Sequence, residues 1–358
     1  PSICVRLRRG LFWYYLQQLQ QAPSLREESS YPLTLMSRSE TRRCAIRVIA
    51  YENRIAVEFF HSVTDGNGGL VFLKSLTAEY LQQKYGEPIP ATEGVLGRLE
   101  APRPEELEDS FLKYAGTVSA SRRENNAWRP QGTAEPDGFL NLTCFRISTS
   151  QALAKAHEYG GRLTTFLCAA AVMALQAMQE THVPNRRRRK PIRVLIPVNL
   201  RKLFPSKTLR NFALYSTPEI DPRLGSYDFQ EICQAVRHRL GLEANSKIMS
   251  TRIATNVGSE KSLLVRIMPL FLKNIVMKAV FNQVGEKKSC LTLSNLGQVT
   301  LPPEMDRYVE RLDFILGAQS SAPHNCGVLS YGDSLYLNFI RSIREPELEA
   351  QVFRVLRD

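Results

Sequence analysis

FHSVTDG, residues 60–66, places a histidine directly after an apolar segment, with a carboxylate and a glycine close behind it. The preceding residues, 54–60, are rich in β-branched and aromatic side chains, which favours a strand. A second segment of this kind spans residues 44–51, and Glu52-Asn53 can form a tight turn between the two. His61 is therefore expected at the end of a strand in a β-hairpin.

A helix is predicted shortly after the histidine. Gly66, Gly68 and Gly69 suggest a glycine-rich bend, and residues 70–85 then carry apolar side chains at helical spacing. Gly86 and Pro88 end this pattern. A strand, a bend and a helix in succession commonly hold one polar side chain at the edge of a core.

The stretch resembles the HHxxxDG signature of the CoA-dependent acyltransferase superfamily, which includes chloramphenicol acetyltransferase and the condensation domains of peptide synthetases. Two later segments extend the resemblance. IPVNLR, residues 196–201, followed by SKTLRNF, residues 206–212, looks like the arginine-then-asparagine segment of these proteins. LSNLG, residues 293–297, looks like their late SNLG strand. The chain is most similar to the bacterial alcohol acetyltransferase-like branch.

The resemblance implies an α/β, two-lobed chloramphenicol acetyltransferase-like fold with an active-site tunnel between the lobes. A chain of 358 residues also exceeds the usual size of a single core. We expect an N-terminal lobe at residues 1–116 that carries the HxxxDG motif, a connection at 117–138 and a C-terminal lobe at 139–358. Because relatives carry a further strand and helix upstream, we expect this chain to be N-terminally truncated, which would affect its activity.

The second half alternates strands and helices, as in α/β proteins. The pattern predicts strands at 140–147 and 192–198 and helices at 151–159 and 166–180, the latter capped near Thr164 and Thr165. Its longest apolar region, 263–280, is interrupted by three cationic residues and an asparagine. It therefore predicts a buried or partly interfacial helix, and no transmembrane segment is expected.

The seven cysteines form no CxxC pair, which favours reduced thiols in a cytoplasmic protein and no metal site. The net charge of +12 suggests an anionic partner: nucleic acid, a membrane surface or a phosphorylated cofactor. No nucleic-acid-binding module is recognisable, so nucleic acid is not expected. The most basic run, residues 186–190, fits either a solvated loop or a position near the phosphates of coenzyme A.

Acyl transfer from a thioester to a hydroxyl needs a base, and histidine can serve at neutral pH. His61 is the candidate; otherwise it would be a structural histidine at a strand end. Asp65 could orient the imidazole, as in a hydrolase triad. The resemblance implies instead that Asp65 points away from the site and forms an ion pair with Arg201. Gly66 would let the chain turn after this carboxylate.

Phe60 stands where the family signature has its first histidine, and we expect it to pack beneath the site. The tetrahedral intermediate needs donors for its oxyanion. Ser294 and Asn295 are candidates, although a strand-terminal turn without a catalytic role is an equal alternative. Asn211 is expected to support the strand geometry near the tunnel.

The expected function is transfer of an acyl group from acyl-CoA, as co-substrate and without a permanently bound cofactor, to an alcohol or amine. The acceptor would attack the thioester directly, without an acyl-enzyme, and the protein would be a cytoplasmic monomer. Two alternatives stay open. One is a carrier-protein-dependent condensation enzyme that uses the same histidine. The other is a truncated, non-catalytic binding protein.

Overall fold

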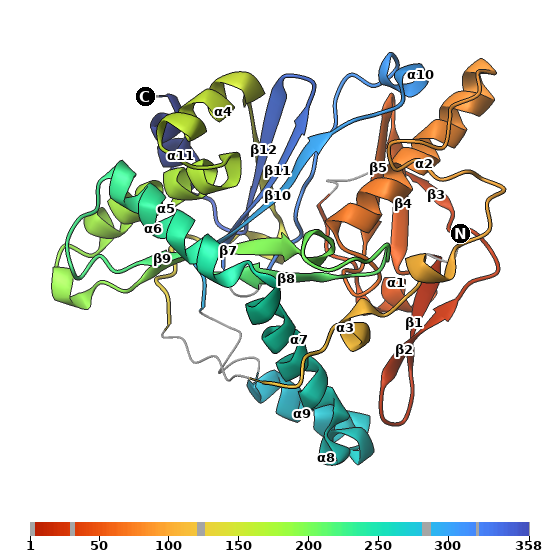
Figure 1. Ribbon diagram of the computed structural model, residues 1–358, viewed down its shortest axis with the longest axis horizontal. Coiled ribbons are helices and arrows are strands. Elements are labelled where there is room, and N and C mark those ends of the chain that lie inside the picture. Colours follow the sequence, from red (N-terminus) through yellow and green to blue (C-terminus); the bar gives the residue numbers. More distant parts are fainter. Residues whose placement is uncertain (1–3, 29–32, 120–125, 281–287, 320–321, 358) are drawn as a thin grey trace.

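The computed structural model describes residues 4–28, 33–119, 126–280, 288–319 and 322–357 (Figure 1). Its largest element is a seven-stranded mixed sheet, with the order β6-β12-β11-β10-β7-β8 and with β9 also paired to β7. Strands β7, β10 and β11 are parallel to one another, and the other pairs are antiparallel. The strands are β6 (Asn141–Ser148), β7 (Ile192–Asn199), β8 (Ala213–Ser216), β9 (Glu219–Ile220), β10 (Leu291–Val299), β11 (His324–Tyr331) and β12 (Ser334–Arg341).

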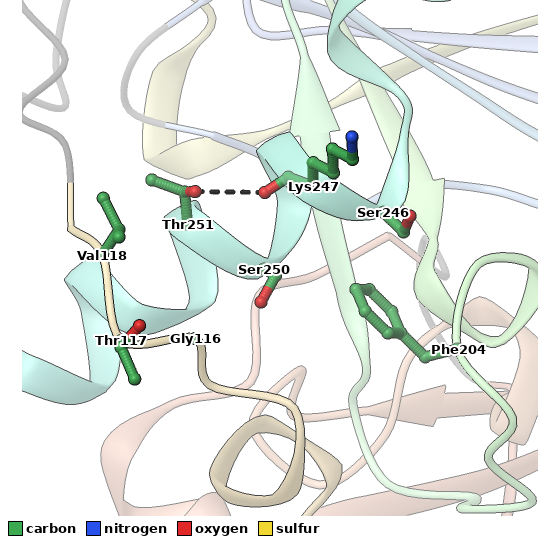
Figure 2. A pocket seen from close by; sticks show the side chains of 8 residues that line it. All are labelled: Gly116, Thr117, Val118, Phe204, Ser246, Lys247, Ser250 and Thr251. Carbon is green, nitrogen blue, oxygen red and sulfur yellow. Dashed lines mark hydrogen bonds between the residues drawn. The ribbon is translucent and has the colours of Figure 1, made fainter.

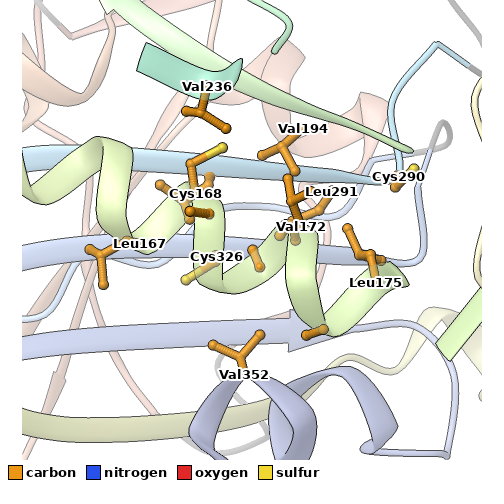
Figure 3. Close-up of a cluster of buried hydrophobic side chains, with 14 of the residues drawn as sticks. Leu167, Cys168, Val172, Leu175, Val194, Val236, Cys290, Leu291, Cys326 and Val352 are labelled. Atoms are coloured by element: carbon orange, nitrogen blue, oxygen red, sulfur yellow. The ribbon is translucent and has the colours of Figure 1, made fainter. Parts of the chain in front are cut away.

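Helix α5 (Leu163–His182) lies at the centre of the main core, against one face of this sheet. Its Cys168 and Val172 lie among side chains of β7, β10 and β11 (Figure 3). It is long and apolar enough to cross a membrane, but 72% of its most apolar 18-residue stretch is buried, as expected of a core helix. The same core includes residues of α4 (Thr149–Glu158), α6 (Phe229–Glu243) and α11 (Glu347–Arg357).

The first part of the chain forms a three-stranded sheet of order β3-β4-β5, with β3 at Leu25–Glu27. The predicted hairpin is confirmed as β4 (Ile46–Tyr51) and β5 (Arg54–Phe59), joined at Glu52, whose φ is 48°. A separate hairpin, β1 (Val5–Arg9) and β2 (Tyr14–Gln18), precedes it. The short helices here are α1 (Arg38–Arg43), η1 (Pro104–Glu106) and α3 (Ser110–Lys113).

Helix α2 (Gly66–Tyr85) begins earlier than predicted. The glycines at 66–69 form its first turn and not a separate bend, because the Asp65 carboxylate caps the free backbone N–H groups of Asn67 and Gly68. The predicted cap of α5 was also wrong: that helix begins at Leu163, after Arg162.

Helix α2 covers the opposite face of the large sheet from α5. Its Leu81 packs with Leu329 of β11, whereas the preceding residue, Val328, packs in the α5 core. Successive side chains of a strand point to opposite faces, so the sheet lies between the two helices. Lys74 of α2 donates to the backbone oxygens of Glu93 (2.7 Å) and Thr300 (2.6 Å), which ties α2 to the end of β10.

The predicted helix at 263–280 is two helices, α8 (Leu263–Ile267) and α9 (Leu270–Val280). Pro269 lies between them; proline has no backbone N–H to donate within a continuing helix. Most apolar side chains of the pair are exposed, so of the two expectations, a buried or a partly interfacial helix, the buried one was wrong. The remaining elements are α7 (Ser246–Lys261), α10 (Pro303–Asp306), η2 (Pro136–Gly138), η3 (Arg186–Arg188) and η4 (Leu200–Lys202).

A buried charged cluster joins β11, β12 and α11. His324 is completely buried, with Nε2 3.9 Å from Oε2 of Glu349, and Glu349 Oε1 accepts a bond of 3.0 Å from Arg341. Burial, reinforced by the Arg341 charge, lowers the pKa of His324 to about 4. Burial raises the pKa of Glu349.

This cluster predicts a loss of stability in mild acid. The folded protein keeps His324 neutral down to about pH 4, whereas the unfolded chain takes up the proton near pH 6.5. The resulting stability is complete above pH 6.5 and is lost as the pH falls toward 4. From pH 7 to pH 5 the loss from His324 should reach about 2 kcal/mol, partly offset by Glu349, which takes up its proton first in the folded state. Urea unfolding at both pH values should show a smaller loss in His324→Gln; an equal loss would contradict the assignment.

Candidate active site

His61 lies two positions after the end of β5, in a turn at residues 61–63, and it is exposed. The preceding residue, Phe60, anchors this turn to the core of the first part of the chain. Phe60 packs with Val5, Ala45 and Val63, and its backbone N–H donates to Ala45. Phe60 therefore contributes an apolar support next to His61.

Asp65 is buried, and its carboxylate accepts four hydrogen bonds. Oδ1 accepts the backbone N–H groups of Asn67 and Gly68, each at 3.1 Å. Oδ2 accepts Nη1 of Arg201 at 2.7 Å and the backbone N–H of Phe212 at 2.9 Å. The predicted ion pair with Arg201 is thus present. Because these four donors engage both oxygens and none comes from His61, Asp65 acts on the loop and does not orient the imidazole.

Arg201 is the middle residue of η4, the short helix that follows β7, and it organises the segment that comes next. Its Nε donates to the Thr208 carbonyl at 2.7 Å, and Nη2 donates to the Arg210 carbonyl at 2.5 Å. Nη1 also reaches Oδ1 of Asn199 at 3.2 Å. One guanidinium therefore fixes residues 208–212 and the Asp65 carboxylate together.

The backbone after His61 approaches this segment closely. The Thr64 hydroxyl donates to the Leu209 carbonyl at 2.6 Å. A Cβ on Gly68 would lie 2.2 Å from that same carbonyl oxygen, so only glycine fits there. A Cβ on Gly66 would lie 2.7 Å from Cδ2 of Leu296, the residue that follows the SN pair of β10. Gly66 thus stands where a Cβ would clash, as predicted, but the predicted turn was wrong because Gly66 is already helical.

Asn211 is the residue that the structure places beside His61. Its Nδ2 lies 3.4 Å from Nδ1 of the imidazole and 3.5 Å from the His61 carbonyl oxygen. Its Oδ1 is buried and has no hydrogen-bond partner among the described residues. Asn211 was predicted as an oxyanion or tunnel residue that supports strand geometry, but its contact with His61 was not, since nothing in its local sequence indicates a contact 150 positions away.

Ser294 and Asn295 face opposite sides of β10. The Asn295 amide donates to Thr164 of α5 at 3.1 Å and accepts the Gly297 backbone N–H at 2.8 Å. Its side chain therefore belongs to the α5 side of the sheet. Ser294 is the neighbouring residue in the strand, so its side chain points to the opposite face of the sheet. It is buried there, on the face that α2 covers and to which Leu296 also points. Of the two, Ser294 is on the side of the His61 loop.

Two cavities lie in other regions. One, of about 430 Å³, lies between residues 116–118 and α7, with Phe204 opposite (Figure 2). In its wall the Thr251 hydroxyl donates to the Lys247 carbonyl at 3.0 Å (Figure 2). The second, of about 740 Å³, is lined by Asn185, Arg186, Arg187 and Arg223. His61 lines neither, and within the described part of the chain no three His, Cys, Asp or Glu side chains gather as a metal site would require.

Comparison with known proteins rests on structure. No family model and no curated protein sequence matches the chain. Polyketide synthase associated protein 5 from Mycobacterium tuberculosis superimposes with a TM-score of 0.55 at 16% identity, over 99% of this chain and 86% of that protein. The epimerization domain from the third module of tyrocidine synthetase B gives 0.54 at 12% identity, over 99% and 84%.

A third similar structure is trichothecene 15-O-acetyltransferase from Fusarium sporotrichioides, with a TM-score of 0.51 at 12% identity over 88% of this chain and 70% of that one. Identities this low report the fold alone. The large mixed sheet between α2 and α5, together with these three likenesses, shows that the chain has the two-lobed α/β fold of these three proteins.

Proposed function

We propose that the protein is an acyltransferase that moves an acyl group from acyl-CoA to an alcohol or amine, with His61 as the general base. The observation that carries the proposal is an exposed histidine on a loop that Asp65 holds through four hydrogen bonds. The fold shared with a trichothecene acetyltransferase supports the reaction class. The held loop and the shared fold together favour His61 as a reacting side chain in a fixed position.

In the proposed reaction the acceptor hydroxyl loses its proton to His61 as its oxygen bonds to the thioester carbonyl carbon. The tetrahedral intermediate then collapses, the carbon–sulfur bond breaks, and the imidazolium returns the proton to the departing thiolate. No covalent bond to the protein forms. The Ser294 hydroxyl is the candidate donor to the oxyanion.

The Asn211 amide lies next to Nδ1 of the His61 imidazole. This contact leaves Nε2 as the nitrogen that takes the proton from the acceptor. A neutral imidazole that accepts a proton on Nε2 must carry its own proton on Nδ1. A half-turn of the Asn211 amide exchanges Nδ2 for Oδ1, and Oδ1 can accept that N–H. We propose that Asn211 is a positioning residue that selects this tautomer.

Replacing His61 by alanine should lower kcat for acyl transfer at least about 100-fold, the usual contribution of general base catalysis. The assay measures thiol release from acetyl-CoA with a panel of alcohols and amines. His238→Ala is the matched control, because His238 is exposed on α6 and has no proposed role. Undiminished turnover in His61→Ala would exclude His61 as the base.

The same assay separates the alternatives. Turnover with an acyl group on a phosphopantetheine carrier protein, but not with acyl-CoA, would identify a condensation enzyme; the likeness to a peptide-synthetase epimerization domain keeps this alternative in view. Tight binding of CoA without turnover would identify a non-catalytic binding protein. A cytoplasmic location and a monomeric state remain part of the proposal.

A further inference from the structure

Two segments far apart in the sequence form one exposed apolar surface. The tip of the β1–β2 hairpin presents Leu11 at 72% exposure, with Phe12 and Trp13 each about two-fifths exposed. Helices α8 and α9 present a larger group: Leu263, Ile267, Phe271, Leu272, Ile275, Val276, Met277 and Val280. Both segments reach the same lower end of the molecule, away from the large sheet (Figure 1).

Specific contacts hold the hairpin tip against α9. The Leu270 backbone N–H donates to the Leu11 carbonyl at 2.9 Å. Lys273 donates to the Phe12 carbonyl at 2.7 Å, and its ammonium lies 3.3 Å from the centre of the Trp13 ring. The surface is therefore arranged before any partner binds, which lowers the entropic cost of docking.

The two segments that form this surface carry charge of one sign. Residues 5–18 and 263–280 contain no aspartate or glutamate, and their cationic side chains are Arg6, Arg8, Arg9, Arg266, Lys273 and Lys278. Aromatic and aliphatic side chains next to Lys and Arg are the composition that binds the interface of an anionic bilayer. An acidic lipid headgroup would pair with the exposed cations, which include Arg266 and Lys278 but not the buried Lys273, while the acyl region accepts the apolar side chains.

We propose that the β1–β2 tip and helices α8–α9 form a docking surface for an anionic lipid bilayer. The protein would attach peripherally, with Trp13 and the exposed face of α9 at the depth of the headgroups. This attachment is separate from the proposed transferase reaction, and neither needs the other to be correct.

The chain carries its own reporter. It has two tryptophans: Trp13 is 41% exposed at the proposed surface, and Trp128 is 7% exposed in the α5 core. Vesicles of phosphatidylcholine with phosphatidylserine should therefore shift the Trp13 emission to shorter wavelength, and the 358-residue protein should sediment with them. Binding should be weaker to phosphatidylcholine alone and should fall as salt is added.

Phe271 and Ile275 lie one turn apart on the exposed face of α9. The variant F271D/I275D should reduce partitioning onto the anionic vesicles at least about tenfold. The control L99D/L224D adds the same charges at two other highly exposed leucines and should bind as the wild type does. R266E/K278E should abolish the preference for phosphatidylserine.

Three results would overturn the proposal. The first is unchanged Trp13 emission and no sedimentation with anionic vesicles. The second is equal binding by F271D/I275D, with circular dichroism showing it folded. The third is a wild-type dimer that F271D/I275D converts to monomer while vesicles have no effect, which would make a second copy the occupant of this surface.

Discussion

Replacing Asp65 by alanine is expected to lower the free energy of unfolding by about 3–5 kcal/mol, as when one partner of a buried ion pair is removed. The Arg201 guanidinium would keep its charge with 10% of its side chain exposed and no carboxylate beside it. The backbone N–H groups of Gly68 and Phe212 would also lose their acceptor. Each unpaired buried donor adds to the loss.

Urea unfolding of Asp65→Ala, Arg201→Leu and the double variant should give a coupling free energy, since the two side chains share one bond. Glu79→Ala is the control. It breaks the exposed Glu79–Arg98 pair and should change stability by less than about 0.5 kcal/mol. A loss below about 1 kcal/mol in Asp65→Ala would show that the carboxylate does not anchor the loop.

Replacing Gly68 by alanine should destabilise the protein by about 3 kcal/mol, the upper end of the usual cost of overpacking. Within a helix this substitution normally stabilises, because glycine is a poor helix former. Here the new Cβ would lie 2.2 Å from the Leu209 carbonyl oxygen and 2.2 Å from the Thr64 hydroxyl. A backbone oxygen cannot move aside without breaking the bond between these two groups.

Gly258→Ala is the control, and its change in the free energy of unfolding should have the opposite sign. Gly258 lies in α7, and a Cβ there would meet no atom within 4 Å. Its replacement should stabilise the protein by up to about 1 kcal/mol. If both alanine variants were stabilised, the close approach of α2 to residue 209 would be disproved.

Local pattern was enough to predict the hairpin before His61 and four elements of the main core, β6, α4, α5 and β7, since alternation and helical spacing reflect burial directly. It failed at the start of α2. Glycine's low helix propensity predicted a bend at 66–69, but the Asp65 cap and the close backbone approach at Gly68 favour the helix. It also failed at 263–280, because hydrophobicity does not reveal whether an apolar helix is covered.

The candidate site was predictable only in part. The Asp65–Arg201 pair came from a family resemblance, since no local pattern joins residues 136 positions apart. The contact of Asn211 with His61 was missed for the same reason. The sequence does not reveal to which face of β10 Ser294 and Asn295 point. Only the pairing of that strand and the position of α5 assign Asn295 to the α5 face and Ser294 to the other.

The long separations behind the Asp65 anchor also bear on folding. Its bonds to Arg201 and Phe212 close loops of 136 and 147 residues. Such contacts form slowly, because the entropy of a long loop is lost before they add stability. The hairpin and α2 rely on local contacts and can form early. A chain still emerging from the ribosome can therefore hold His61 at the end of a formed hairpin, but the loop becomes fixed only after residue 212 has been made and packed.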